Sequence, residues 1–274
     1  MEGLLGRRPL RRRRLPEPPI AIAEVQGYVY DAKVRAAELA AEVWGDPDLA
    51  ARLRREAEEL RERFSRDFWT DARGGYYAIG LDREKRRIDS MASNMGHLLW
   101  SGIVPEDRAP AVARRLLSPP MFSGWGIRTL SEEDAAYNPI GYHTGSVWPH
   151  DNSIAAAGLA RYGFREEANR VAMAMLEAAG ITGHRLPEVF AGYARGDAPF
   201  PVRYPTACNP QAWATAAPFL FLRTMLGLEA EGALRCDPHL PPEVGRVYLH
   251  GVHAFGTHLD VEAEGTSGRV APTH

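Results

Sequence analysis

The chain has 274 residues, of which 45% are hydrophobic and 25% charged, as in an ordinary globular protein of one large domain or two small ones. Its formal net charge of −2 at pH 7 excludes the basic excess that attracts nucleic acid or anionic membranes. Two cysteines, Cys208 and Cys236, cannot form a disulfide framework, and no apolar run approaches the roughly 18 residues of a membrane span. We therefore expect free thiols in a cytoplasmic, reducing compartment.

The first 15 residues carry a dense basic run, Arg7–Arg14. No apolar segment follows it, so the pattern does not indicate a secretory signal. No second basic cluster with interleaved aromatics accompanies the run, which favours a disordered segment over a nucleic-acid arm or a nuclear address. A further alternative is that residues 1–15 are not the natural start of a domain.

Apolar residues at 3–4 spacing predict a first helix over Val25–Trp44 and a second over Asp48–Phe68. Between them, Gly45-Asp46-Pro47 is typical of a helix stop followed by a proline-started helix. We expect an antiparallel helical hairpin. The glycine-bounded run of residues 74–81 predicts a short strand or hairpin arm.

Five more helices are predicted further along the chain, over Ser93–Ser101, Ala109–Leu117, Gly145–Tyr162, Arg165–Ala179 and Asn209–Leu226. Short connections alternate with long ones, and the side chains suited to chemistry fall on the long ones. This arrangement is typical of a ring of helical hairpins with a pocket at one end. The predicted fold class is mostly α, over residues 16–228.

After Leu228 the hydrophobic pattern changes to period two, which predicts a small β appendage over residues 229–264 and a frayed tail over 265–274. The spacing of His250, His253 and His258 suits neither a helix face nor a strand face, so we expect surface or packing roles and no metal. No phosphate loop, dinucleotide fingerprint or nucleophile elbow is present, and no cofactor is expected.

Three blocks in the long connections combine aromatic, basic and carboxylate side chains: Ser123–Arg128, Tyr142–Asp151 and Arg185–Phe190. Such side chains suit a sugar, which has apolar ring faces and a rim of hydroxyls. Glu188 lies in an apolar and aromatic setting, where desolvation would tune a carboxylate for acid or base catalysis. The alternative, a helix cap or an ion pair with Arg185 or Arg195, stays open.

Other residues in these connections also have two interpretations. Asp151 suits the first turn of a helix, a role compatible with a sugar contact. Trp125, Trp148 and Trp213 suit either sugar stacking or the core, and glycine-flanked Trp125 is the strongest stacking candidate. Arg128 suits either a ligand contact or bracing of the loop.

Together with Glu17–Tyr28, these blocks resemble bacterial amylo-alpha-1,6-glucosidase-like proteins. These are glycogen-debranching-type members of the six-hairpin (α/α)6 glycosidase superfamily, whose relatives include glucoamylases, trehalases and mannosylglycerate hydrolase-like enzymes. The resemblance covers about Pro16 to Glu264, and its most specific parts are Ser146–Asn152 and Pro187–Trp213. It implies a partial toroid of about seven of twelve helices.

In that superfamily, inverting hydrolysis uses a general acid after the fifth helix and a general base after the eleventh. The resemblance places the base at Glu188. The acid would lie just before Pro16, where Leu10–Leu15 contains no matching motif. We therefore expect an incomplete enzyme with weak activity alone. The resemblance also implies substrate contacts. Together with further residues from the three blocks, the predicted contact residues are Glu24, Gln26, Trp125, Arg128, Tyr142, His143, Trp148, His150, Asp151 and Trp213.

The expected reaction is inverting cleavage of an α-glucosidic bond in an oligosaccharide or α-glucoside. A non-catalytic carbohydrate-binding or assembly subunit is the main alternative, with the missing N-terminal half or a second copy as partner. Such a half ring would expose apolar helix faces. A sugar epimerase would need paired histidines, for which His143 and His150 are available. No nucleic-acid or membrane partner is expected.

Overall fold

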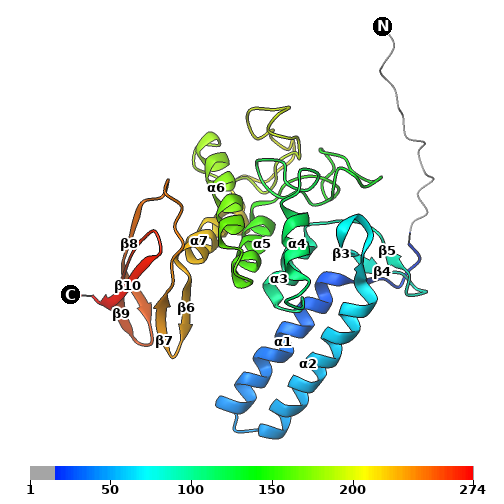
Figure 1. Ribbon diagram of the computed structural model, residues 1–274. Coiled ribbons are helices and arrows are strands. Elements are labelled where there is room, and N and C mark those ends of the chain that lie inside the picture. The colour runs from blue at the N-terminus through cyan, green and yellow to red at the C-terminus, as the bar shows by residue number, and fades with distance from the viewer. Residues whose placement is uncertain (1–15, 274) are drawn as a thin grey trace, which may run out of the picture.

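The computed structural model describes residues 16–273, and the basic run of residues 1–15 lies outside this range. The described chain begins with the predicted hairpin, α1 (Ala23–Glu42) and α2 (Pro47–Phe68). Pro47 opens α2, and the Asp46 side chain caps it by accepting a hydrogen bond from the Leu49 N–H at 2.9 Å. The hairpin projects from the rest of the molecule, so much of its surface faces outward (Figure 1).

Five further helices form the body: α3 (Asn94–Ser101), α4 (Ala109–Leu116), α5 (Pro149–Arg161), α6 (Arg165–Ile181) and α7 (Ala212–Leu226). Helix α5 packs against α3, α6 and α7 and is buried along most of its length. It begins at Pro149, four residues later than predicted, because proline has no N–H to donate and starts a helix well. Helix α7 likewise begins at Ala212 rather than Asn209.

Helices α3 and α5 touch at two glycines. A Cβ added to Gly96 would lie 2.4 Å from the Cβ of Ala155, and one added to Gly158 would lie 2.6 Å from the backbone oxygen of Gly96. Real Cβ atoms do not approach so closely, so only glycine permits this crossing. The crossing brings His97 beside Asp151, one turn before Ala155 on the same face of α5.

Short strands lie on the N-terminal side of the body. They are β1 (Ala21–Ile22), β2 (Trp69–Thr70), β3 (Tyr76–Tyr77), β4 (Gly80–Leu81) and β5 (Arg87–Ile88), in the orders β1-β4-β5 and β2-β3. The predicted run of residues 74–81 is therefore two strands in different sheets, preceded by the 3-10 helix η1 (Ala72–Gly74). Isolated antiparallel bridges connect Arg128 to Val147, Val147 to Phe190 and Phe190 to Arg203, and so align the long loops.

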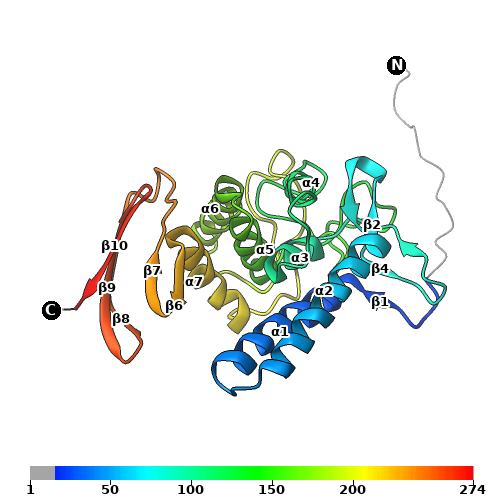
Figure 2. The same cartoon turned by 60° about the horizontal axis from the view of Figure 1, so that its bottom comes forward.

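The C-terminal region forms two sheets, the hairpin β6 (Leu228–Glu231) with β7 (Ala233–Cys236), and the meander β8 (Arg246–Ala254), β9 (Thr257–Glu264) and β10 (Ser267–Pro272). The tail expected to fray instead forms β10, which pairs with β9 across a turn at Gly265. The prediction was wrong because polar residues on an outer strand resemble a loop. Figure 2 shows the meander as an outer layer beyond β6 and β7.

The described chain is mostly helical, with seven α-helices and small C-terminal sheets. It thus confirms the predicted fold class, a partial helical toroid with a β appendage. None of the helices within residues 16–273 combines the length and apolar character needed to cross a membrane.

Candidate active site

Glu188 lies in the loop between α6 and α7, held by three donors from two segments of the chain. The Tyr142 hydroxyl donates to Oε1 at 2.7 Å, and the Cys208 backbone N–H donates to Oε2 at 3.1 Å. Gln211 Nε2 makes a longer contact with Oε1 at 3.5 Å. The backbone N–H of Glu188 in turn donates to the Cys208 carbonyl at 3.0 Å. The residue is only 6% exposed, so its carboxylate is held in a fixed orientation.

These donors set the charge of the site. The hydrogen bond from Tyr142 lowers the pKa of Glu188 most, the Cys208 N–H adds to it, and desolvation opposes both more weakly. The sequence prediction had desolvation as the tuning force; in the structure, hydrogen bonding outweighs it. The same bond raises the pKa of Tyr142 to about 12, so the phenol keeps its proton at neutral pH. Glu188 is therefore an ionised carboxylate, able to accept a proton.

An aromatic cluster adjoins Tyr142, the donor to this carboxylate. The rings of Tyr142 and Trp148 meet edge to face at 4.7 Å, and those of His150 and Trp213 stack at 4.2 Å with an interplanar angle of 8°. Trp148 also meets Trp213 edge to face at 5.9 Å. Trp213 is 45% exposed, whereas Trp148 is buried. The cluster thus contains one accessible indole, Trp213 on α7, next to the buried indole of Trp148.

The two histidines of the Tyr142–Asp151 block differ in their surroundings. His143 is exposed and stacks on Trp148 at 5.6 Å. His150 is partly buried, and burial lowers its pKa, so its ring is neutral at pH 7. Among the described residues nothing hydrogen-bonds to His150 Nδ1. A sugar hydroxyl is a group that such a nitrogen can bind.

Trp125 occupies a different environment from the one its glycine neighbours suggested. It is buried, Arg195 Cζ lies 3.7 Å from its ring centroid, and its Nε1 donates to the Ala198 carbonyl at 3.2 Å. None of these contacts is shared with the Glu188 cluster. A sugar would have to displace Arg195 to stack on this face, so the described geometry favours the packing interpretation over the stacking one.

Arg128 is fully buried and braces the loops. Its Nε donates to the Gly192 carbonyl at 2.7 Å, Nη1 donates to the Pro119 carbonyl at 2.9 Å, and Nη2 pairs with Glu132 at 2.7 Å. These partners leave little of the guanidinium for a ligand. Of the two interpretations left open by the sequence, the geometry favours bracing.

A second polar centre lies between α1, α3 and α5. Asp151 Oδ1 is 2.7 Å from His97 Nε2, and His97 Nδ1 is 2.7 Å from the Tyr28 hydroxyl. The Tyr28 hydroxyl lies 2.6 Å from Glu24 Oε1, and Asn94 donates to the other oxygen of Glu24. We call Glu24, Tyr28, His97 and Asp151 the relay. It contains two of the predicted contact residues.

The electrostatics of the relay favour charge separation. Burial raises the pKa of Asp151, but the hydrogen bond and charge of His97 outweigh it and leave the pKa lowered. Burial lowers the pKa of His97, yet the bond to Asp151 and the charges of Asp151 and Glu24 leave it raised. Both the carboxylate and the imidazole thus favour their ionised forms.

Sequence reasoning missed His97. Its neighbours Met95, Gly96, Leu98 and Leu99 are all buried, and a histidine within an apolar helix was the available signal. Gln26, which was predicted beside Glu24, makes only a local bond from Nε2 to the Ile22 carbonyl at 3.2 Å. The structure therefore separates Gln26 from the relay that includes Glu24.

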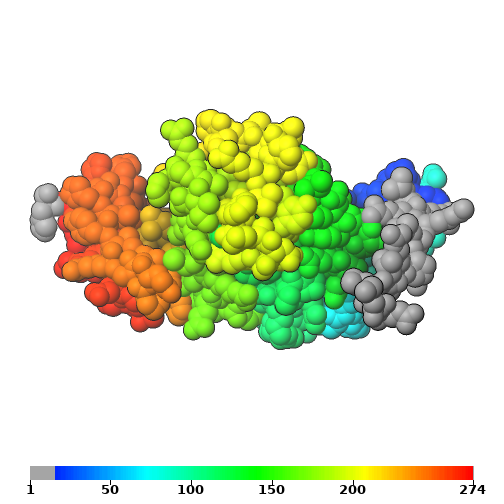
Figure 3. All heavy atoms as spheres, turned by 90° about the horizontal axis from the view of Figure 1, so that it is seen from above, coloured from blue at the N-terminus to red at the C-terminus, as the bar shows by residue number. Residues whose placement is uncertain are grey.

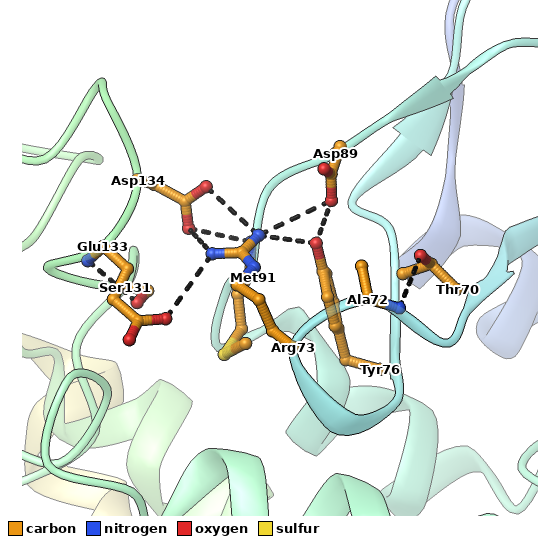
Figure 4. A network of polar contacts seen from close by, with 9 residues as sticks. All are labelled: Thr70, Ala72, Arg73, Tyr76, Asp89, Met91, Ser131, Glu133 and Asp134. Carbon is orange, nitrogen blue, oxygen red and sulfur yellow. Dashed lines mark hydrogen bonds and ion pairs between the residues drawn. The ribbon is translucent and has the colours of Figure 1, made fainter.

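The long loop before Tyr142 is anchored to the N-terminal strands. Arg73 points between Asp89, Glu133 and Asp134, and its Nη2 donates to the Tyr76 hydroxyl at 2.5 Å (Figure 4). Burial raises the pKa of Asp134, which also accepts the Met91 N–H at 3.0 Å. The anchor restrains the loop that carries Tyr142.

The loop between α6 and α7, which carries Glu188, lies across the middle of one face of the molecule (Figure 3). The three C-terminal histidines lie at the end of the molecule, on β8 and β9, where His250 pairs with Asp260 at 2.9 Å. The described residues contain no cluster of three or more His, Cys, Asp or Glu side chains that could hold a metal.

Helical hairpins whose long loops hold a carboxylate and aromatic rings are compatible with a glycoside-hydrolase type of domain. Comparison with known sequences agrees. Residues 11–193 match the mannosylglycerate hydrolase MGH1-like glycoside hydrolase domain, and the chain belongs to this family, within the six-hairpin glycosidase superfamily. A mannosylglycerate hydrolase of Rubrobacter radiotolerans is 29% identical over 146 residues, which are 51% of this chain and 32% of that protein.

Solved structures share the fold. The neutral trehalase of Saccharomyces cerevisiae superposes with a TM-score of 0.59 at 19% identity, covering 75% of this chain and 38% of that one. The GH63 mannosylglycerate hydrolase of Thermus thermophilus in complex with glucose gives 0.57 at 18% identity, covering 74% and 48%. The same enzyme with Tris and D-glycerate gives 0.58 at 20% identity, covering 74% and 46%. The chain thus spans between a third and a half of these relatives.

Proposed function

We propose that this chain supplies the water-activating base and part of the sugar cleft of an inverting glycoside hydrolase. The observation that carries the proposal is the setting of Glu188, an ionised carboxylate held by Tyr142 and the Cys208 N–H. Tyr142 belongs to the aromatic cluster that includes the exposed ring of Trp213. Indole faces bind the apolar faces of sugars, and a fixed carboxylate can remove a proton from water.

In this mechanism Glu188 takes a proton from a water molecule as its oxygen attacks the anomeric carbon. The glycosidic bond breaks, and a carboxylic acid protonates the departing oxygen. The two carboxyl groups of an inverting enzyme stand about 6.5–9.5 Å apart to leave room for the water. We assign only the base to a residue of this chain. Without an acid in that place, turnover by the chain alone would be weak.

The substrate we propose is a small α-glucoside or oligosaccharide, the class expected from the sequence. The relatives widen the set to be tested, because they include a mannosylglycerate hydrolase, a trehalase and a structure with bound glucose. Glycogen-derived oligosaccharides test the debranching activity that the sequence resemblance implied.

The test compares wild-type protein with Glu188→Gln on α-glucosides, trehalose, mannosylglycerate and glycogen-derived oligosaccharides. We expect slow release of free sugar with inverted anomeric configuration by the wild type, and none by the variant. Glu59→Gln, an exposed carboxylate on α2, is the control for general damage. Equal rates for wild type and Glu188→Gln, or hydrolysis with retention, would contradict the assignment of the base.

A second candidate function, a carbohydrate-binding or assembly subunit, is favoured by one observation on α1. Its apolar residues Val25, Val29, Leu39 and Val43 recur at helical spacing on one face and are all exposed, Val43 by 69%. Phe219 of α7 is exposed as well. The partner we propose for this α1 stripe is a set of amphipathic helices that complete the ring.

Light scattering tests this second candidate. The wild-type protein should self-associate or precipitate, because the α1 stripe is exposed apolar surface, whereas Leu39→Asp should be monomeric. Ala36, partly buried on the same face, offers a milder control through Ala36→Ser. A monodisperse wild-type monomer would count against the assembly role. A cytoplasmic location remains a prediction from the two free cysteines.

A further inference from the structure

We propose that His97 is a positioning residue, a doubly protonated imidazolium that ties Asp151 of α5 to Glu24 of α1 through Tyr28 and fixes the orientation of both carboxylates, which we predict to contact the sugar. The distances within the relay determine how many protons its four side chains must share. The consequence for sugar binding rests on the proposed function, whereas the charge of His97 does not.

The number of protons in the relay points to this charge. Three hydrogen bonds connect the four side chains, at 2.7 Å, 2.7 Å and 2.6 Å, and each needs one proton. An ionised Asp151, a neutral His97, a neutral Tyr28 and an ionised Glu24 hold only two. The relay therefore carries one proton more than its groups have in their ordinary neutral-pH forms.

The extra proton belongs on His97. Ionised Asp151 can only accept, so Nε2 carries a proton toward it. The Tyr28 hydroxyl has a single proton, which it donates to Glu24, so its oxygen accepts from a proton on Nδ1. The alternative, a protonated Glu24, is opposed by Asn94, which donates to the second oxygen of Glu24 and favours the carboxylate.

The surroundings support this charge. Toward His97 face Glu24 and Tyr28 from α1, and Asp151 and His150 from α5. His150 is neutral, while the two carboxylates are negative. His97 itself is buried, so these charges act on it with little screening by solvent.

The relay crosses three helices, which gives it a mechanical role. A Cβ on Gly27 of α1 would lie 2.7 Å from the Ser101 hydroxyl of α3, so α1 and α3 also pack closely. Loss of one proton from His97 would leave two protons for three bonds. One bond must then break, and either Glu24 or Asp151 loses its fixed orientation. Sugar affinity should fall as His97 deprotonates.

Nitrogen NMR of the full chain tests the charge directly. At pH 7 both ring nitrogens of His97 should carry protons, and the signal should change to that of a neutral ring only well above the ordinary histidine pKa of about 6.5. Tyr28→Phe removes the Nδ1 acceptor and should lower the pH of that change. The signal of the exposed His143 serves as an internal reference. A single protonated nitrogen on His97 at pH 7 would overturn the inference.

Calorimetry with glucose tests the positioning role. We expect affinity to fall at least about fivefold across the pH range in which the His97 signal changes, and His97→Gln to bind weakly at every pH. A constant affinity across that range would overturn the positioning role. If glucose does not bind at all, the proposed function fails and the positioning role with it, whereas the doubly protonated signal of His97 would persist.

Discussion

The two carboxylate centres reach the same charge by different means. Glu188 lies on a loop and is held ionised by neutral donors, a phenol and a backbone N–H. Asp151 lies on a helix and is held by His97, whose own charge depends on pH. Neutral donors thus make a carboxylate insensitive to pH changes above its own pKa, while a histidine partner adds a second titration. We call Glu188 with its donors the loop centre, and Asp151 with His97 the helix centre. The loop centre suits proton transfer, and the helix centre suits fixed binding.

The largest expected effect is on catalysis at the loop centre. Glu188→Gln keeps the shape of the side chain but removes the base, and the rate of glycoside hydrolysis should fall by about 10²–10⁴-fold, the usual contribution of general base catalysis. Release of free sugar over time measures it. If Asp151→Asn lowered the rate of the bond-breaking step more than Glu188→Gln does, the assignment of roles to the two centres would be reversed.

The next largest effect is expected on the stability of the protein, when His97 in the helix centre is replaced. His97→Ala leaves Asp151 buried without its charged partner and should lower the free energy of unfolding by roughly 3 kcal/mol at pH 6. The folded pKa of His97 is raised, so its stabilising contribution is complete below about pH 6.5 and is lost as pH rises through the folded value. Urea unfolding at pH 6 and pH 9 measures the difference. An equal loss at both pH values would argue against a charged His97.

A smaller effect is expected when the loop centre loses its phenol. Tyr142→Phe removes the strongest donor to Glu188, so the pKa of Glu188 should rise toward its ordinary value of about 4.3. The acidic limb of the pH–rate profile should then move to higher pH, and the rate at neutral pH should fall about tenfold or less. Tyr204→Phe, which alters a neighbouring ring without a bond to Glu188, is the control. An unmoved acidic limb would mean that Tyr142 does not set the charge.

The smallest effect is expected on the exposed stripe of α1. Leu39→Ala should change the free energy of unfolding of the monomer by about 0.5 kcal/mol or less, because nearly half of this residue is exposed to solvent. Leu98→Ala, in the buried part of α3, should cost roughly 2–5 kcal/mol and is the matched comparison. A large cost at Leu39, found only at high protein concentration, would indicate that the stripe is buried in an assembly.

The sequence was sufficient for the helices and insufficient for pairings between distant segments, and the catalytic role that it suggests for Glu188 stays a prediction. Periodicity reports which face of a helix is apolar, so all seven helices were predicted within a few residues of their ends. It does not report that Tyr142 hydrogen-bonds to Glu188, or that His97 hydrogen-bonds to Asp151. Glycine neighbours suggested an exposed Trp125, yet Arg195, 70 residues later in the chain, covers its ring. The strand at the C-terminus was missed for the same reason, since its partner β9 supplies the pairing that its own pattern lacks.

The contact between α3 and α5 has a consequence for protein engineering. Gly96 and Gly158 set the spacing of the two backbones, and a single methyl group at either position would wedge the helices apart. His97 and Asp151 would then separate without any change to either residue. Transplanting this acid–imidazole pair into another scaffold would therefore require copying two residues that have no side chain, along with the two that do.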